Sequence, residues 1–241
     1  MSPAPALRLA GRATIDGAPV FGPLAVDAPA GQWTCLLGPS GVGKSTILRL
    51  FAGLGDGVAF EGEAGAGDGR PLAGRVALMA QSDLLMPWLD ATANVTLGAR
   101  LRGEPPRTDR ARAVLARVGL AEHADKRPDA LSGGQRQRVA LARTLMEDRP
   151  VVLLDEPFSA LDARSRARMQ DLAAELLADR TVLHVTHDAA EAARLGHRVL
   201  LMTGQGVEAI APPAAPTPRP FDGPDTLDFQ SRLLRQLLEA A

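Results

Sequence analysis

The stretch "WTCLLGPSGVGKSTILRLF", residues 33–51, decides the fold that this sequence predicts. It opens with a strand-length, mainly apolar run and closes with an amphipathic pattern of helical length. The loop between them fits the phosphate-binding pattern of Gly38, four further residues, Gly43, Lys44 and Ser45. Because a strand precedes this loop and a helix follows it, we interpret the stretch as a nucleotide-binding loop rather than a chance run of glycines.

The loop has the groups that a nucleotide triphosphate and its magnesium ion need. Its glycines allow backbone N–H groups to close around phosphate oxygens. Lys44 brings a positive charge to the terminal phosphates, and the Ser45 hydroxyl is a ligand for Mg²⁺. The sequence therefore predicts ATP and Mg²⁺ as cofactors. The expected nucleotide-binding residues are Gly38, Pro39, Ser40, Gly41, Val42, Gly43, Lys44, Ser45 and Thr46.

Polar residues follow three other strand-length apolar runs. "VVLLDEP" ends with Asp155, which is suited to hold Mg²⁺ through water, and Glu156, which is suited to accept a proton from an attacking water. "TVLHVTHD" carries His187 near its end, and "RVALMAQ" ends with Gln81, a further candidate ligand of Mg²⁺. Ligands bind at the carboxyl ends of parallel strands, so we expect these residues near the phosphate-binding loop. His184 lies within its apolar run, and we interpret it as structural.

Apolar runs that alternate with amphipathic helical patterns predict an α/β fold, with a nucleotide-binding core built on a mostly parallel sheet. Ahead of Gly38, "LRLAGRATI" and "GPLAVDA" predict an N-terminal antiparallel β subdomain. The glycine-rich stretch 62–74 is expected to be a flexible hairpin or loop. A mainly helical pattern over about 84–146 predicts a helical insertion subdomain between strands of the core.

The C-terminal part has a different character. We expect the main domain over residues 1–211, a stiff proline-rich linker over 212–220 and an amphipathic helix within 221–241. Asp225 or Thr226 is available as the cap of this helix. Its apolar face packs on the same chain or docks on a partner chain.

The composition limits the function further. The 241 residues carry a formal net charge of −1, so the chain offers no basic field for nucleic acid. The apolar runs are too short to span a membrane, and residues 1–12 lack the apolar core of a secretory signal. The one cysteine, Cys35, excludes internal disulfides and is expected to be a small buried side chain. We therefore expect a cytoplasmic location.

A second anion-binding pattern, "LSGGQRQR", lies at residues 131–138, far from the first, and contains no lysine. Ser132, Gly133 and Gly134 precede a helical pattern that runs to about Glu147. A polar residue and glycines at a helix start are typical of an anion-binding helix N-terminus. Taken alone, the stretch is an ordinary helix cap.

The ensemble resembles the ATP-binding subunit of ABC transporters, over nearly the whole chain up to about Ala211. The resemblance rests on "GPSGVGKST", Gln81, "LSGGQRQR", "VVLLDEP", "SALD" and His187, which occur in the order of that family. It implies that Glu156 is the general base of ATP hydrolysis and that His187 is the switch histidine. It also implies that Gln81 senses the γ-phosphate and transmits to a membrane partner.

The resemblance further implies a homodimer. The signature residues Ser132, Gly133, Gly134 and Gln135 would contact the ATP bound by the opposite subunit, and Asp162 would help to assemble the interface. The other implied partners are an integral membrane permease and, indirectly, a solute-binding protein, with no nucleic acid. The expected location is peripheral, on the cytoplasmic face of the inner membrane.

The segment "SDLLMPWLDATANV", directly after Gln81, corresponds in such transporters to the groove for the permease. Its apolar residues are equally consistent with packing inside the helical subdomain. The "LLMPW" stretch is most similar to importers of the nitrate, sulfonate, taurine and thiamine-precursor group. The alternatives are a soluble ATPase of the same superfamily that is not tied to transport and, with less support, a small-molecule kinase.

One departure from the family concerns the adenine. The family usually places a stacking aromatic residue near the position of Ile15, and this chain has no tyrosine. An aliphatic side chain would lose a stacking contribution of about 1 kcal/mol. We therefore expect weaker ATP affinity or looser discrimination among bases.

Overall fold

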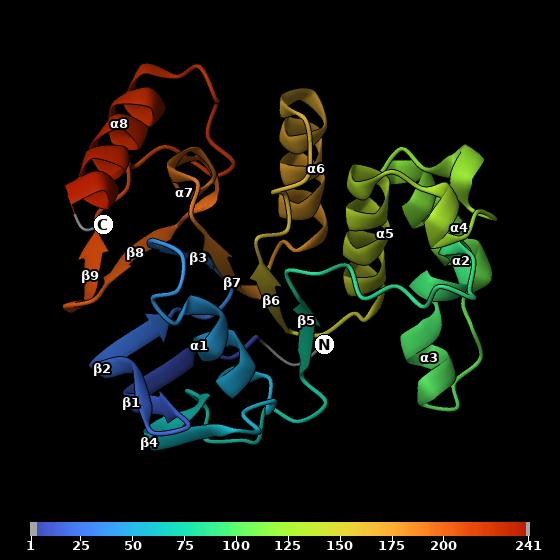
Figure 1. Cartoon of the computed structure of the whole chain (residues 1–241). Coiled ribbons are helices and arrows are strands. Elements are labelled where there is room, and N and C mark those ends of the chain that lie inside the picture. The colour runs from blue at the N-terminus through green and yellow to red at the C-terminus, as the bar shows by residue number, and fades with distance from the viewer. Residues whose placement is uncertain (1–3, 240–241) are drawn as a thin grey trace. The chain divides into compact units, whose positions relative to one another are not determined.

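The computed structural model describes residues 4–239, which form two compact units (Figure 1). The first, called the core unit here, comprises the residues up to Leu78, Arg149–Asp155 and the residues from Ala178 onward. The second, called the helical unit, comprises Met79–Asp148 and Glu156–Leu177.

A six-stranded sheet carries the core unit. Its strands are β3 (Trp33–Leu37), β5 (Val76–Met79), β6 (Val151–Asp155), β7 (Thr181–Thr186), β8 (Arg198–Thr203) and β9 (Gly206–Ile210). They lie in the order β5-β6-β7-β3-β8-β9. The pairs β6/β7, β7/β3 and β3/β8 are parallel, and β9 is antiparallel to β8. Every residue of β3 and β6 is buried, which explains their nearly continuous apolar sequences. The predicted mostly parallel sheet is confirmed.

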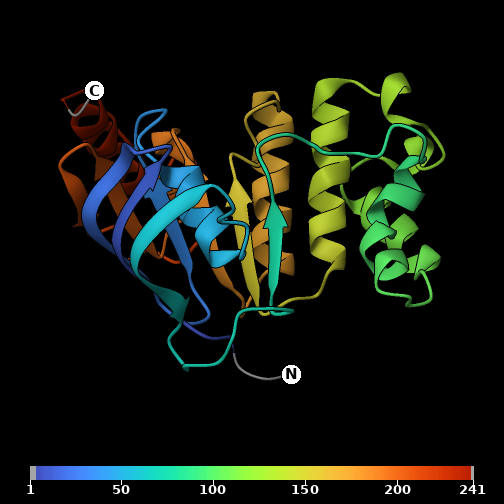
Figure 2. The ribbon, with the colours of Figure 1, turned by 60° about the horizontal axis from the view of Figure 1, so that its bottom comes forward.

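A second, antiparallel sheet is built from β1 (Leu7–Ile15), β2 (Ala18–Ala28) and β4 (Val58–Ala66), in the order β2-β1-β4. Figure 2 shows these three strands, in blue and cyan, curving side by side. The N-terminal antiparallel β subdomain is therefore confirmed.

The expectation of a flexible hairpin or loop from residue 62 onward is wrong for its first part, because β4 continues through Ala66. Gly62 pairs with Gly11 of β1, and a Cβ atom on Gly62 would collide with the carbonyl of Ala10. The glycines thus permit a close approach of two strands that local composition cannot reveal.

Helix α1 (Lys44–Phe51) buries Ile47, Leu48 and Phe51 in one apolar cluster with residues of both sheets. Burial of each of these side chains stabilises the fold by about 1.5–3 kcal/mol. Cys35 is fully buried, as expected, and burial raises the pKa of its thiol. The helix that supports the phosphate-binding loop is therefore fixed by the core itself.

The helical unit consists mainly of helices. It contains the predicted helical stretch of about 84–146 and also Glu156–Leu177, which the prediction left outside the insertion. Its helices are α2 (Ala91–Val95), α3 (Leu97–Leu101), α4 (Thr108–Arg117), α5 (Gly133–Met146) and α6 (Ala163–Leu176), with short 3₁₀ turns at Ala121–His123 and Pro128–Ala130. Within residues 4–239, no helix is both long enough and apolar enough to cross a membrane.

At the C-terminal end, α7 (Ala189–Leu195) and α8 (Pro224–Glu239) pack against each other in the core unit (Figure 1). Phe229 and Leu233 of α8 are buried, whereas Leu234 and Leu238 on its other side are exposed. The amphipathic helix thus places its apolar face on its own chain.

The expected cap of this helix is wrong. Helix α8 begins at Pro224, and the N–H of Leu227 donates to the carbonyl of Gly223, so Asp225 and Thr226 lie inside the first turn. Proline suits the first helical position because its fixed φ is already helical and it has no N–H to leave unpaired. Residues 240 and 241 of the expected segment lie outside the described residues.

The proline-rich segment is anchored by Arg219, whose side chain is only 2% exposed. Its guanidinium donates to the carbonyls of Ala193 at 2.8 Å, Gly196 at 2.9 Å and Pro213 at 2.8 Å. The backbone N–H of Arg219 donates to the carbonyl of Arg194 at 2.9 Å. The arginine therefore closes the carboxyl end of α7, where a cation is favourable and carbonyl groups need donors.

We expect Arg219→Met to lower the free energy of unfolding by about 2–4 kcal/mol, because three carbonyl groups lose a buried donor. Chemical denaturation of the full chain measures this change. The matched control is Arg235→Met, an exposed arginine of α8, for which we expect a change within about 0.5 kcal/mol. Equal stability of the two variants would contradict the anchoring role.

Candidate nucleotide site

The phosphate-binding loop joins β3 to α1 and holds the Lys44 ammonium inside it. Lys44 Nζ donates to the carbonyl oxygens of Gly38 at 2.8 Å and Pro39 at 2.6 Å. The lysine is only 5% exposed, whereas the neighbouring Ser45 is exposed. The loop therefore presents a buried positive charge next to an accessible hydroxyl, which is the pair of groups expected for a phosphate and its metal ion.

The shape of the loop depends on its glycines. Gly43 has φ 104°, and a Cβ atom there would lie 3.0 Å from the side chains of Val20 and Phe21. A Cβ atom on Gly38 would collide with the carbonyl of Met202 in β8. Of the remaining loop residues, Ser40 and Gly41 are exposed, Val42 is half-buried and Thr46 is buried.

The parallel register brings the other expected residues of the core unit to the same edge of the sheet. Asp155, the last residue of β6, pairs with Val185, and Leu37, the last residue of β3, pairs with Thr186. His187 and the phosphate-binding loop therefore begin at adjacent strand ends, and Asp155 ends the next strand along. Asp155 is 8% exposed, so its carboxylate is largely shielded from water.

A buried network anchors the turn that carries His187. Thr186 Oγ1 donates to Glu191 Oε2 at 2.9 Å, and His184 Nε2 lies 3.1 Å from the same oxygen. The N–H of Asp188 donates to Thr186 Oγ1 at 3.0 Å. His184, Thr186 and Glu191 are buried, whereas His187 is exposed. The interpretation of His184 as structural is confirmed. The buried network holds the backbone next to His187 in place, and the His187 side chain lies at the surface.

In the helical unit, Gln81 and Glu156 meet although they are 75 residues apart in sequence. Gln81 Nε2 donates to Glu156 Oε2 at 3.3 Å. Glu156 adopts φ 49°, a conformation that residues other than glycine rarely adopt. Such strain is often found at functional sites, where the surroundings hold it in place.

Ser132 caps α5 through a complete capping box. The N–H of Gln135 donates to Ser132 Oγ at 3.3 Å, and the N–H of Ser132 donates to Gln135 Oε1 at 2.8 Å. A Cβ atom on Gly133 would approach the side chain of Arg136 no closer than 3.9 Å, so this helix start is open. The geometry is that of an accessible helix N-terminus without a lysine.

Asp162 caps α6, since its Oδ1 accepts from the N–H of Ser165 at 2.9 Å. This hydrogen bond lowers the pKa of the Asp162 carboxyl. The loop before Asp162 lies against the first turn of α5, where a Cβ atom on Gly134 would be 3.1 Å from the carbonyl of Ala160. Within one chain Asp162 is thus a helix cap, and its expected place at a dimer interface stays a prediction.

Two arginines of α5 hold the segment after Gln81, and sequence reasoning did not single them out. Arg136 Nε donates to Asp83 Oδ2 at 2.9 Å. Arg143 donates to the carbonyls of Asp83 at 2.6 Å and Leu84 at 2.8 Å. Burial lowers the pKa of Arg143. The partners lie more than fifty residues away, so no local pattern marks these contacts.

Gln137 is a further residue that sequence reasoning missed, although a signal for it exists. It stands four residues before Leu141 and eight before Leu145, on the buried face of α5. A polar side chain at such a position needs hydrogen-bond partners inside the protein. Its partners are the carbonyl of Glu156 and groups of the loop that follows it.

The apolar segment after Gln81 divides between the interior and the surface. Leu85 is 8% exposed, whereas Leu84 is 59% and Trp88 66% exposed. Leu84 also has φ 46°, and Arg143 holds its carbonyl. Packing inside the unit therefore explains why residue 85 is apolar. The backbone conformation of Leu84, in contrast, keeps its side chain exposed to water.

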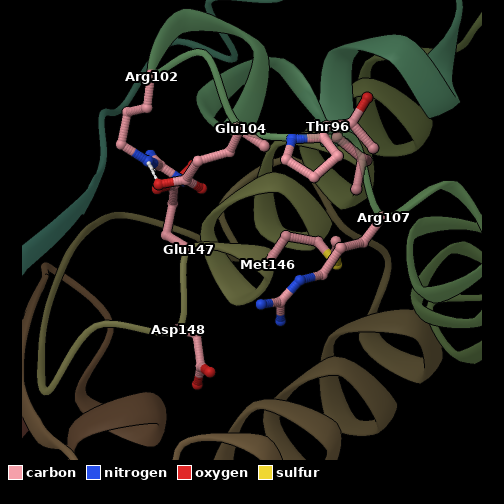
Figure 3. Close-up of a pocket in the computed structure, with 10 residues that line it drawn as sticks. Thr96, Arg102, Glu104, Arg107, Met146, Glu147 and Asp148 are labelled. Atoms are coloured by element: carbon pink, nitrogen blue, oxygen red, sulfur yellow. Dashed lines mark hydrogen bonds and ion pairs between the residues drawn. The ribbon is translucent and has the colours of Figure 1, made fainter.

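A cavity of about 220 Å³ opens on the same unit, between α3 and the end of α5 (Figure 3). Its wall combines apolar groups, such as Val95 and Met146, with charged side chains. In Figure 3 Arg102 and Glu147 point toward each other, and they form an ion pair at 2.6 Å. Arg102 also pairs with Glu104 at 2.9 Å.

Comparison with known proteins decides the family. A family model for the ABC transporter matches residues 21–159, which is more than half of the chain. The chain belongs to the ABC transporter family. It is the ATP-binding subunit of an ABC import system for a small solute, and it is an ATPase that energises transport. The family assignment gives no support to the alternative interpretation of the chain as a small-molecule kinase.

Several ABC proteins are similar over most of their length. An uncharacterized ABC transporter ATP-binding protein of Haemophilus influenzae is 42% identical and covers 92% of this chain and 94% of its own. The aliphatic sulfonates import ATP-binding protein SsuB 2 of Agrobacterium fabrum is 48% identical, over 78% of this chain and 71% of its own. The dimeric structure of MJ0796, a bacterial ABC transporter cassette, is 28% identical and matches 84% of this chain and 96% of its own with a TM-score of 0.74.

We expect Lys44→Ala to weaken ATP binding about 10- to 100-fold, since a hydrogen bond to a charged group contributes about 1.5–3 kcal/mol. Titration calorimetry measures the dissociation constant. The control is Lys126→Ala, which removes the other lysine of the chain at an exposed position. Unchanged affinity of the Lys44 variant would rule out the assignment of the phosphate-binding loop.

Proposed function

We propose that two copies of this chain enclose ATP at a shared interface, hydrolyse it and thereby drive a membrane permease. The observation that carries this proposal is that the anion-binding groups are divided between the core unit and the helical unit. The core unit holds a buried lysine in its loop, whereas the helical unit offers an open helix start at Ser132 without a lysine. The two halves complement each other if the helix start meets the nucleotide held at Lys44 of a second copy. The dimeric ABC cassette that this chain resembles supports such an arrangement.

The residues of the core unit fit the phosphates and Mg²⁺. The Ser45 hydroxyl is exposed, and the Asp155 carboxylate ends a strand at the same edge of the sheet. Oxygen ligands of this kind suit Mg²⁺, with Gln81 as a further proposed ligand. When bound, Mg²⁺ neutralises charge on the β- and γ-phosphates. Lys44 adds a fixed positive charge within the loop.

Glu156 is the proposed general base. Its carboxylate accepts a proton from the attacking water while the water oxygen bonds to the γ-phosphorus and the bond to the bridging oxygen breaks. His187 is proposed to donate a hydrogen bond to the γ-phosphate. Gln81 contacts the Glu156 carboxylate at 3.3 Å. It thereby links hydrolysis to the chain segment that follows Gln81.

In this proposal ATP drives transport by shifting a conformational equilibrium. ATP binds the closed dimer more tightly than the open one because only the closed dimer supplies Ser132 and its neighbours. Closure of the dimer therefore favours one state of the permease. Hydrolysis of ATP lets the dimer reopen and the permease return to its other state. Asp162, at the start of α6, is proposed to lie at the same interface.

The helical unit offers the surface for the permease. Leu84 and Trp88 are exposed apolar side chains, and Leu101 on α3 is 78% exposed. A contiguous patch of exposed apolar side chains is typical of a protein interface, and we propose that these three residues contribute to one. The strained backbone of Leu84, held by Arg143, keeps one of them outward. The chain would then sit peripherally on the cytoplasmic face of the membrane.

The transported solute is proposed from the relatives. Proteins named as aliphatic sulfonate importers are 48% and 44% identical to this chain over most of its length. We therefore propose a small sulfonate-type anion, delivered to the permease by a solute-binding protein.

We expect Glu156→Gln to lower kcat by about 10²- to 10⁴-fold and to retain ATP binding, because the amide cannot accept the proton. Size-exclusion chromatography should then show an ATP-dependent dimer that persists. Glu175→Gln, an exposed carboxylate of α6, serves as the control and should hydrolyse normally. Near-normal turnover by the Glu156 variant would exclude it as the base.

We expect Ser132→Arg to leave ATP binding by the monomer intact, because Lys44 and its loop are unchanged. The bulky cation would block the helix start, so ATP-dependent dimerisation and hydrolysis should be lost. The control is Ser231→Arg, at an exposed position of α8. A Ser132 variant that still dimerises with ATP would argue against the shared site.

A further inference from the structure

Gln137 is buried on α5, with 6% of its surface exposed, and both ends of its amide contact one distant loop. Its Nε2 donates to the carbonyl of Glu156 at 3.1 Å and to Ser159 Oγ at 3.2 Å. Its Oε1 accepts from the N–H of Ala160 at 2.9 Å. A buried amide whose donor and acceptor ends are both used specifies one arrangement of the loop.

These contacts converge on the strained backbone of Glu156. The residue has φ 49°, and its carbonyl also accepts from the N–H of Ser159 at 3.3 Å and from Ser159 Oγ at 3.0 Å. A left-handed conformation at a residue other than glycine persists only where neighbouring groups hold it. Because the backbone sets the direction of the Cα–Cβ bond, the donors on this carbonyl also set where the carboxylate projects.

We propose that Gln137 is a positioning residue for ATP hydrolysis, which fixes the backbone of Glu156 so that its carboxylate meets the attacking water. The inference rests on the proposed role of Glu156 as the general base. Gln137 acts through the main chain of that residue. Its acceptor end also accepts from the N–H of Ala160, two residues before Asp162, so one side chain contacts the loop at both Glu156 and Ala160.

The direct test is Gln137→Leu, which removes all three hydrogen bonds and keeps a similar volume. We expect kcat to fall about 10- to 100-fold while KM for ATP stays within about twofold, because a displaced base impairs hydrolysis and leaves the phosphate-binding loop unchanged. The matched control is Thr144→Val, buried on the same helix, which loses only a bond to the carbonyl of Ala140. A folded Gln137→Leu with kcat within about twofold of wild type would overturn the proposal.

A second measurement separates positioning from general destabilisation. In the Glu156→Gln background, Gln137→Leu should leave the ATP concentration for half-maximal dimerisation unchanged, because no base remains to be displaced. Loss of that dimer would mean that Gln137 is needed for the fold and would overturn the positioning role. If Glu156→Gln itself turns over normally, the proposed base fails, and this inference fails with it.

Ser159→Ala decides the case if Gln137→Leu does not fold. Ser159 is exposed, so its substitution spares the core, yet it removes one donor to the Glu156 carbonyl and one partner of Gln137. We expect kcat to fall about 3- to 10-fold with KM for ATP unchanged. An unchanged kcat would overturn the positioning role of Gln137. If Glu156→Gln still loses turnover in that case, the proposed role of Glu156 as the general base stands.

Discussion

The parallel alignment of β6, β7 and β3 is the constraint on which the nucleotide site depends. The pairings of Asp155 with Val185 and of Leu37 with Thr186 bring three strand ends to one edge. A slip of one residue would turn each side chain to the other face of the sheet. Because these strands are buried on both faces, a slip would require both packed faces of the sheet to repack, so the lysine loop, the carboxylate and His187 start from fixed positions.

In the helical unit, helix α5 is the element that holds the candidate functional segments in place. Ser132 opens it, Arg136 and Arg143 hold the segment after Gln81, and Gln137 holds the loop of Glu156. One helix of 14 residues thus contacts both the segment after Gln81 and the loop that carries Glu156. A helix of this length is stiff, so its open start and the proposed base belong to one rigid support within the unit.

The parts of the site that the sequence could reveal are those encoded locally. The phosphate-binding loop, the strand ends and the α5 capping box follow from spacing and periodicity over a few residues. The strand through Gly62 was missed because its partner, Gly11, lies 51 residues away (62 − 11), and composition alone disfavours a strand there. The contacts of Gln137 and Arg219 were missed because most of their partners lie 19 to 26 residues away along the chain. The role of Ile15 toward adenine stays a prediction.

In the proposed dimer each ATP is held by Lys44 of one copy and Ser132 of the other. Mixing Lys44→Ala with Ser132→Arg tests this arrangement directly. Each variant alone has two defective sites, whereas the mixed dimer has one intact site and one doubly defective site. We expect ATP hydrolysis, measured as phosphate release, to appear when the two inactive variants are combined. A mixture that stays as inactive as its components would contradict the shared site.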